Sequence, residues 1–165
     1  MKKIILIATA LCLLLVVTVG CNASPVGLTE AERLAQSTPS EYNLPLDVNI
    51  LDGVSMKIQD VSPTGLVFFF ENQTDNEYIY GSDFILYTLS NNTWERVEPI
   101  IENWAFTSEA YSIFPNATTA ETSVDWQWLF GELPSGYYQF QKEILFVRRP
   151  GDFDRHLLAA TFLIR

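Results

Sequence analysis

The alternation of apolar and polar positions is most regular in residues 124–138. Val124, Trp126 and Trp128 alternate with polar residues, which is the period of a strand with one buried and one solvated face. A turn is predicted at 133–136, where a proline fixes one backbone angle and a final glycine can take a positive φ. The pattern therefore predicts a strand that carries both tryptophans into the core, followed by a tight corner.

Tyr138 opens the strand after this corner. It stands two residues after Gly136 and two before Phe140. This is the placement of the tyrosine corner of immunoglobulin-like sandwiches, with Phe140 where an antibody domain has its second cysteine.

Alternating or wholly apolar stretches recur along the rest of the chain, separated by turn signals every eight to twelve residues. The stretch 66–70 is apolar on both faces and is expected to be a central strand. Residues 99–116 are expected to form a long connection with one short strand at 111–114. The other predicted strands cover residues 54–61, 78–80, 84–89, 94–97, 138–147 and 156–164.

Seven to nine short strands without a long helix predict an all-β fold, an antiparallel immunoglobulin-like β-sandwich. A lipocalin-type barrel is the alternative, but it requires longer and more even strands.

The N-terminal segment has the layout of a secretory signal. Lys2 and Lys3 precede seventeen uncharged residues, 4–20. The sequence Val-Thr-Val-Gly-Cys at 17–21 resembles the lipobox of bacterial lipoproteins, which implies that Cys21 receives diacylglycerol and becomes the new N-terminus. The alternative is an uncleaved membrane anchor, for which this length is near the short limit. Both place the remaining chain outside the cell, because the positive flank stays inside.

Three segments follow from these patterns: a signal peptide at 1–20, a tether at 21–53 and one domain at 54–165. The tether is expected to be flexible, because prolines and serines interrupt it and few large apolar residues are present.

Charge and cysteine content limit the function further. The chain carries 10 basic and 20 acidic side chains, and removal of the signal leaves a net charge near −12. Nucleic-acid binding is therefore not expected, because little would neutralise phosphates. Of the two cysteines only Cys21 remains in the mature chain, which excludes an intrachain disulfide.

Several segments together are similar to a bacterial immunoglobulin-like domain of secreted and lipid-anchored proteins of Gram-positive bacteria. The resemblance covers residues 54–164 and implies the sandwich fold, an extracytoplasmic setting and no established catalytic residue. The segments are Met56–Leu66, Tyr80–Gly81, Val124–Trp126, Leu129–Pro134, Gly136 and Tyr138.

No catalytic residue is predicted. His156 is the only histidine and stands beside Asp154 and Arg155. A serine triad would need a serine brought to this histidine, and the chain has no Gly-x-Ser-x-Gly elbow. The protein is therefore predicted not to be an enzyme.

No metal or cofactor is predicted either. Asp152, Asp154 and the turn at 72–77 offer oxygen ligands of the kind that calcium needs, but neither has a calcium-loop spacing. Asp and Asn are also ordinary turn-forming residues. Zinc would lack ligands, with one histidine and no free thiolate.

Four aromatic residues at strand ends or in the long connection are candidate partner contacts: Trp94, Trp104, Phe106 and Tyr111. They could stack on a sugar ring or anchor a protein, or they could simply cover the core. The first hypothesis is a lipid-anchored, non-enzymatic module at the extracytoplasmic face of the cell membrane that presents loops to a protein or wall polymer. An inhibitor or regulatory partner of an extracytoplasmic peptidase is the second and needs a protruding, rigid loop. A hydrolase is the third and needs His156 beside a serine in a pocket.

Overall fold

The computed structural model describes residues 48–165. The predicted signal segment, Cys21 and the tether up to residue 47 lie outside the described residues. Within residues 48–165, no helix is long and apolar enough to cross a membrane.

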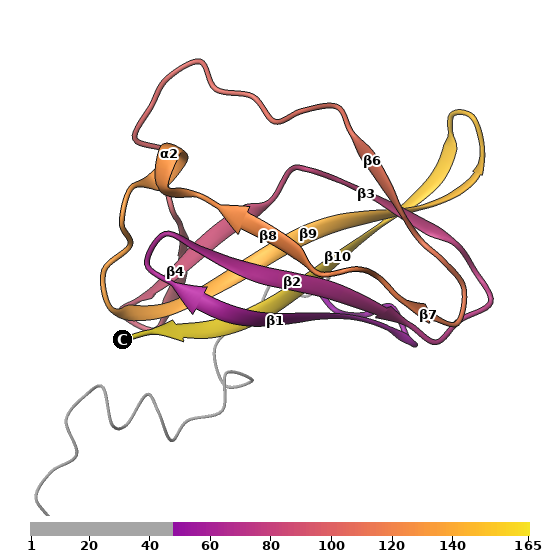
Figure 1. Ribbon diagram of the computed structural model, residues 1–165, viewed down its shortest axis with the longest axis horizontal. Coiled ribbons are helices and arrows are strands. Elements are labelled where there is room, and N and C mark those ends of the chain that lie inside the picture. The colour runs from indigo at the N-terminus through magenta and orange to yellow at the C-terminus, as the bar shows by residue number, and fades with distance from the viewer. Residues whose placement is uncertain (1–47) are drawn as a thin grey trace, which may run out of the picture. The chain divides into compact units, whose positions relative to one another are not determined.

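Two antiparallel sheets pack face to face, as Figure 1 shows. In the first sheet, β2 (Gly65–Asn72) is central, with β1 (Val54–Ser62) on one side and the short β7 (Ala117–Thr118) and β8 (Thr122–Asp125) on the other. The immunoglobulin-like sandwich is thus confirmed, and so is the central place of the apolar strand.

The second sheet is built around β9 (Gly136–Arg149), which pairs along its whole length with β10 (Asp152–Ile164). The other side of β9 carries two consecutive strands, β3 and β4, and each of these has one further neighbour, β6 and β5 respectively. Their bounds are Tyr78–Gly81 for β3, Ile85–Ser90 for β4, Thr93–Arg96 for β5 and Ala110–Ile113 for β6. Each predicted strand has a counterpart, and only the two-residue β7 was missed, because two residues show no period.

The line of β3 and β4 is broken opposite the middle of β9. Tyr80 pairs with Ile144 and Ile85 with Gln141, so four residues, 81–84, face only two on β9. The chain leaves the sheet again beside this break, because the connection 97–109 runs from β5 to β6. The break therefore opens the sandwich along one side.

The core lies between the sheets and is rich in aromatic rings. Phe68 of β2 contacts Phe140 of β9 with their ring centroids 5.5 Å apart, and both side chains are almost fully buried. At the opposite edge of the second sheet, Asn49 bonds to β10: its backbone N–H donates to Leu157 and its side-chain amide exchanges two hydrogen bonds with Ala159.

The predicted tyrosine corner is confirmed. Tyr138 is 2% exposed and its hydroxyl donates to the carbonyl of Pro134 at 2.9 Å. The glycine with the positive φ is Gly131, at 73°, and not Gly136, which instead begins β9.

The prediction of one strand through both tryptophans is wrong, because neither lies in a strand, although Trp126 does enter the core as predicted. β8 ends at Asp125, and the one-turn helix α2 (Gln127–Phe130) follows. Trp126 is fully buried and its indole N–H donates to the carbonyl of Pro63 at 2.9 Å. Trp128 turns outward and is 46% exposed.

These two tryptophans provide a matched test of the core. Trp126→Phe is expected to lower the free energy of unfolding by about 2–4 kcal/mol, because it leaves a cavity and removes the indole hydrogen bond to Pro63, whose carbonyl keeps only the bond from the Leu133 backbone N–H. Trp128→Phe should lower it by less than about 1 kcal/mol, since nearly half of this side chain is exposed and its indole hydrogen bond to the Asp125 carbonyl is at the surface. Urea denaturation of both variants measures the difference, and equal losses would contradict the assigned burial.

Candidate functional site: a pocket above Lys142

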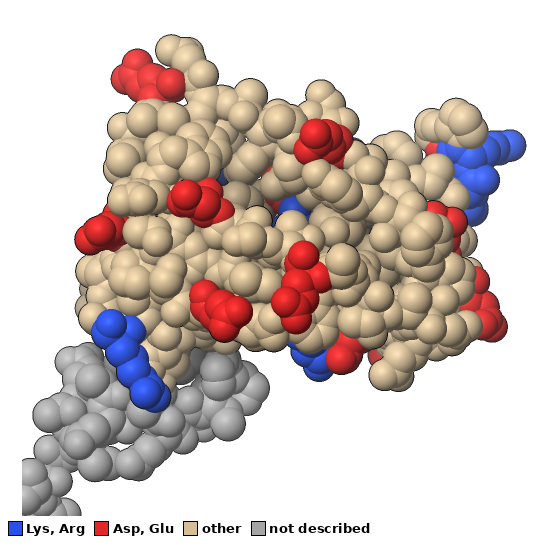
Figure 2. Space-filling model, in the orientation of Figure 1, with Lys and Arg blue, Asp and Glu red and all other residues tan. Residues whose placement is uncertain are grey.

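A pocket of about 240 Å³ lies at the open side of the sandwich. Figure 2 shows this face hollowed near its centre, with basic atoms at the bottom of the hollow. Lys142 is the one basic residue among the described residues that line the pocket. We call this hollow the Lys142 pocket. Its walls come from both sheets, α2 and the connection 97–109, and include Tyr80, Phe106, Tyr111, Thr122, Asp125 and Trp128.

Lys142 belongs to the inner face of β9, where it stands between the buried residues Phe140 and Ile144. Its ammonium reaches the break between β3 and β4 and donates hydrogen bonds to the carbonyls of Gly81 at 2.6 Å and Asp83 at 2.5 Å. These carbonyls belong to segment 81–84, where the backbone pairing with β9 is interrupted. The lysine therefore replaces the backbone donors that the break removes.

The environment of the ammonium is mainly aromatic. It lies 5.4 Å from the ring centroids of both Phe68 and Tyr80, within range of a cation–π interaction. The side chain is 2% exposed, and burial lowers its pKa to about 8, against a smaller opposing effect of Asp83. Among the ion pairs of residues 48–165, none involves this lysine.

Aromatic side chains form the rim. Phe106 is half-buried and packs against Phe84 at 5.1 Å and Trp128 at 6.4 Å between ring centroids. Tyr111, on the opposite side, is 43% exposed and lies 5.3 Å from the ring of Tyr80.

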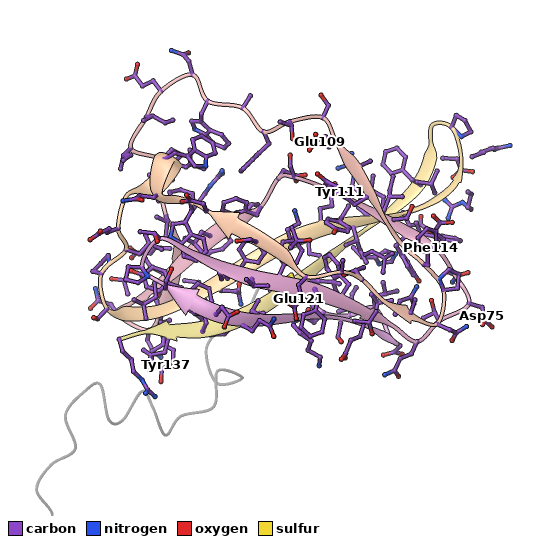
Figure 3. All side chains as sticks on the ribbon, in the orientation of Figure 1. Asp75, Glu109, Tyr111, Phe114, Glu121 and Tyr137 are labelled. Atoms are coloured by element: carbon purple, nitrogen blue, oxygen red, sulfur yellow. The ribbon has the colours of Figure 1, made fainter. Side chains whose placement is uncertain are left out.

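Glu109 holds the Tyr111 side chain at this rim. The phenol donates to the Glu109 carboxylate at 2.7 Å, and this hydrogen bond is the main cause of the raised pKa of Tyr111. Figure 3 shows both residues at the start of β6, apart from Phe114 at its far end.

The four aromatic residues predicted from sequence do not form one surface. Phe106 and Tyr111 line the Lys142 pocket, and Trp104 packs on Phe106 at 5.1 Å without lining it. Trp94 lies on β5 outside this pocket, with its indole N–H buried and without a hydrogen-bond partner among residues 48–165.

Two residues of the pocket were missed. Trp128 was placed in the core because its period matched a strand. Lys142 carried a signal that could have identified it. It is the one charged residue in the apolar alternation of Tyr138, Phe140, Ile144 and Phe146.

The other candidate residues have structural partners. His156 is half-buried against the edge of Tyr78, with 6.2 Å between the ring centroids. No hydrogen bond within residues 48–165 joins His156 to a serine. Asp152 and Asp154 bind the guanidinium of Arg148. No group of three or more potential metal ligands occurs in the described part of the chain.

The Asn72 side chain stabilises the turn at 72–77, and Asp75 accepts a hydrogen bond from the Asn116 amide. Asn72 is 2% exposed; its amide donates to the carbonyl of Asn76, and its side-chain oxygen accepts from the backbone N–H of Thr74.

The model of one protein family, described as a bacterial Ig-like domain, matches residues 51–163. A comparison with curated proteins gives no significant match.

The buried lysine makes stability depend on pH. In the folded protein its pKa is lowered from 10.5 to about 8, so the folded state binds this proton less tightly than the unfolded chain. The free-energy cost of burying the charged lysine is fully present below pH 8. It decreases as the pH rises toward 10.5, the pKa in the unfolded chain, so the free energy of unfolding increases between these two values. Between about pH 7.5 and 9.5, the free energy of unfolding should rise by about 2 kcal/mol relative to Lys142→Met.

Urea denaturation at several pH values measures this gain, and the window ends below the ordinary tyrosine pKa of ~10. A difference between the natural protein and Lys142→Met that stays constant with pH would contradict the assigned environment.

Proposed function

Because this chain belongs to the bacterial Ig-like domain family, we propose that it is a non-enzymatic binding module whose binding site is the Lys142 pocket. In this proposal Cys21 carries a diacylglycerol anchor, and the module stands at the extracytoplasmic face of the cell membrane of a Gram-positive bacterium. Its partner is a protein or a wall polymer.

The observation that carries the proposal is a pocket with exposed aromatic residues at the side of the sandwich. Trp128 and Tyr111 keep 46% and 43% of their surface exposed, although both adjoin the core. Tryptophan and tyrosine are the residues that most often dominate binding energy at interfaces. The neighbouring Phe106 is held by its core contacts, so a ligand would meet a wall that is already ordered.

The anchor is supported by the N-terminal sequence alone. Two lysines, a seventeen-residue uncharged stretch and a cysteine follow one another in the order of a lipoprotein signal. A single acyl chain binds membranes only marginally, whereas two chains anchor a protein stably, and diacylglycerol supplies two.

A second candidate function, inhibition or regulation of an extracytoplasmic peptidase, is favoured by the hairpin of β9 and β10. Its tip projects from the sandwich in Figure 1. Arg148 is bound there by Asp152 and Asp154, while Arg149 is 78% exposed. This is the protruding, braced loop that such a function needs.

The anchor predicts a defined chemical change at one cysteine. Mass spectrometry of the protein from membranes should show a chain that begins at a diacylglyceryl Cys21. Cys21→Ala should retain residues 1–20 and lose incorporation of labelled fatty acid. Cys12→Ala is the matched control and should be processed normally, because Cys12 lies in the removed segment. A natural protein that retains its signal without lipid would establish the uncleaved anchor instead.

The binding site predicts which residues a partner needs. The full-length protein, purified in detergent, is cross-linked to cell envelopes and the captured partner is quantified. Trp128→Ala is expected to reduce capture about tenfold or more, as for an interface hot spot. Phe114→Ala is the matched control, since this residue is 60% exposed but does not line the pocket.

Equal capture by both variants would contradict a binding site at the Lys142 pocket. Capture of a peptidase that is lost with Arg149→Ala, and unaffected by Trp128→Ala, would favour the second candidate.

A further inference from the structure

We propose that the ligand of the Lys142 pocket is an extended peptide that places a carboxylate, attached to an apolar body, against the Lys142 ammonium. This inference rests on the proposed function and names the ligand chemistry of that same site.

The first step concerns charge. Lys142 is 2% exposed, and its hydrogen bonds go to two neutral carbonyls. Burying a cation costs several kcal/mol, and buried charges in proteins are normally paired with an opposite charge. An ammonium has three N–H donors, of which the two carbonyls use two. The Asp83 carboxylate offsets only part of this cost. No ion pair within residues 48–165 includes Lys142, so a ligand anion would complete the balance.

The second step concerns protonation. With a pKa of about 8, Lys142 is mostly charged at neutral pH. The groups that face it are Asp83 beside the strand break, Asp125 at the end of β8, and the phenols of Tyr80 and Tyr111. Asp125 already accepts the backbone N–H of Gln127 at 2.8 Å, at the end of β8. Asp83 and Asp125 near the ammonium and Glu109 at the rim repel a carboxylate monoanion less than they repel a phosphate dianion.

The third step concerns the body of the ligand. The rings of Phe106, Tyr111 and Trp128 surround the pocket, so a group attached to the carboxylate meets mainly apolar surface. A volume of about 240 Å³ is large enough for one aromatic or large aliphatic side chain but not for a long polymer segment. A sugar acid would leave most of its hydroxyls without partners at this surface.

The fourth step concerns the backbone of the ligand. Among residues 48–165, β6 pairs only with β3 and β8 pairs only with β2, so each has a free edge next to the pocket. Unpaired strand edges bind extended peptides by adding a strand, with alternate side chains entering pockets. An extended peptide can therefore pair with an edge and insert a side chain or its C-terminus toward Lys142.

The test uses the full-length protein in detergent micelles with isotope-labelled lysine. The chain has four lysines, Lys2, Lys3, Lys57 and Lys142, so the side-chain NMR signals can be assigned individually. The probes are N-acetylphenylalanine, its uncharged amide, and glucuronate. The first should shift the Lys142 signal with a Kd in the millimolar range, as expected for a fragment of about 15 non-hydrogen atoms.

The amide and glucuronate should each bind about tenfold more weakly, since one lacks the charge and the other the apolar body. Trp128→Ala should weaken binding of N-acetylphenylalanine about fivefold while the melting temperature stays within a few degrees, and Phe114→Ala should not weaken it. Lys142→Met should abolish the preference for the carboxylate over the amide. If Lys142→Met fails to fold, the Trp128→Ala measurement decides.

Equal binding of the carboxylate and the amide would overturn the role of the charge. Tighter binding of glucuronate would overturn the peptide in favour of an acidic polymer. If no probe shifts Lys142 while the captured envelope partner still requires Trp128, the binding module stands and the carboxylate inference fails. If no probe shifts the Lys142 signal and capture does not require Trp128, the proposed function fails together with the carboxylate inference.

Discussion

The site depends on two hydrogen bonds from one ammonium group to the carbonyls of Gly81 and Asp83. β3 and β4 would otherwise form one strand beside β9, but four residues face two at their junction. Both carbonyls are only partly buried, so leaving them unpaired would cost at most about 1–3 kcal/mol each, the cost of a buried polar group. Because Lys142 donates to both, the break has a fixed geometry, and the connection 97–109 can leave the sheet beside it.

This break explains why the pocket lies at the side of the sandwich rather than among the loops at its ends. β5 pairs with β4 and β6 pairs with β3, so the interruption between β3 and β4 also separates β5 from β6. Side chains that a continuous edge strand would cover remain accessible there. Phe106 closes part of the opening by packing on Phe84 and on Trp128.

Local sequence patterns predicted most of the fold. The strands and the corner at Tyr138 were visible because residues two apart share a face and because the corner uses neighbouring positions. Trp128 was misplaced for a physical reason: the alternation of Trp126 and Trp128 fits a strand equally well. The strand ends because Trp126 reaches across to Pro63, sixty-three residues away, and because Asp125 caps the turn that follows.

The sequence by itself determined an all-β domain, its strands and the aromatic residues available for its core and rim, because these properties follow from the period and size of neighbouring side chains. It could not determine which of those residues meet. Phe106, Tyr111, Trp128 and Lys142 come from four separate segments, and only the packing of two sheets brings them together. The pairing offset that creates the pocket is likewise a relation between strands sixty residues apart, which no local pattern records.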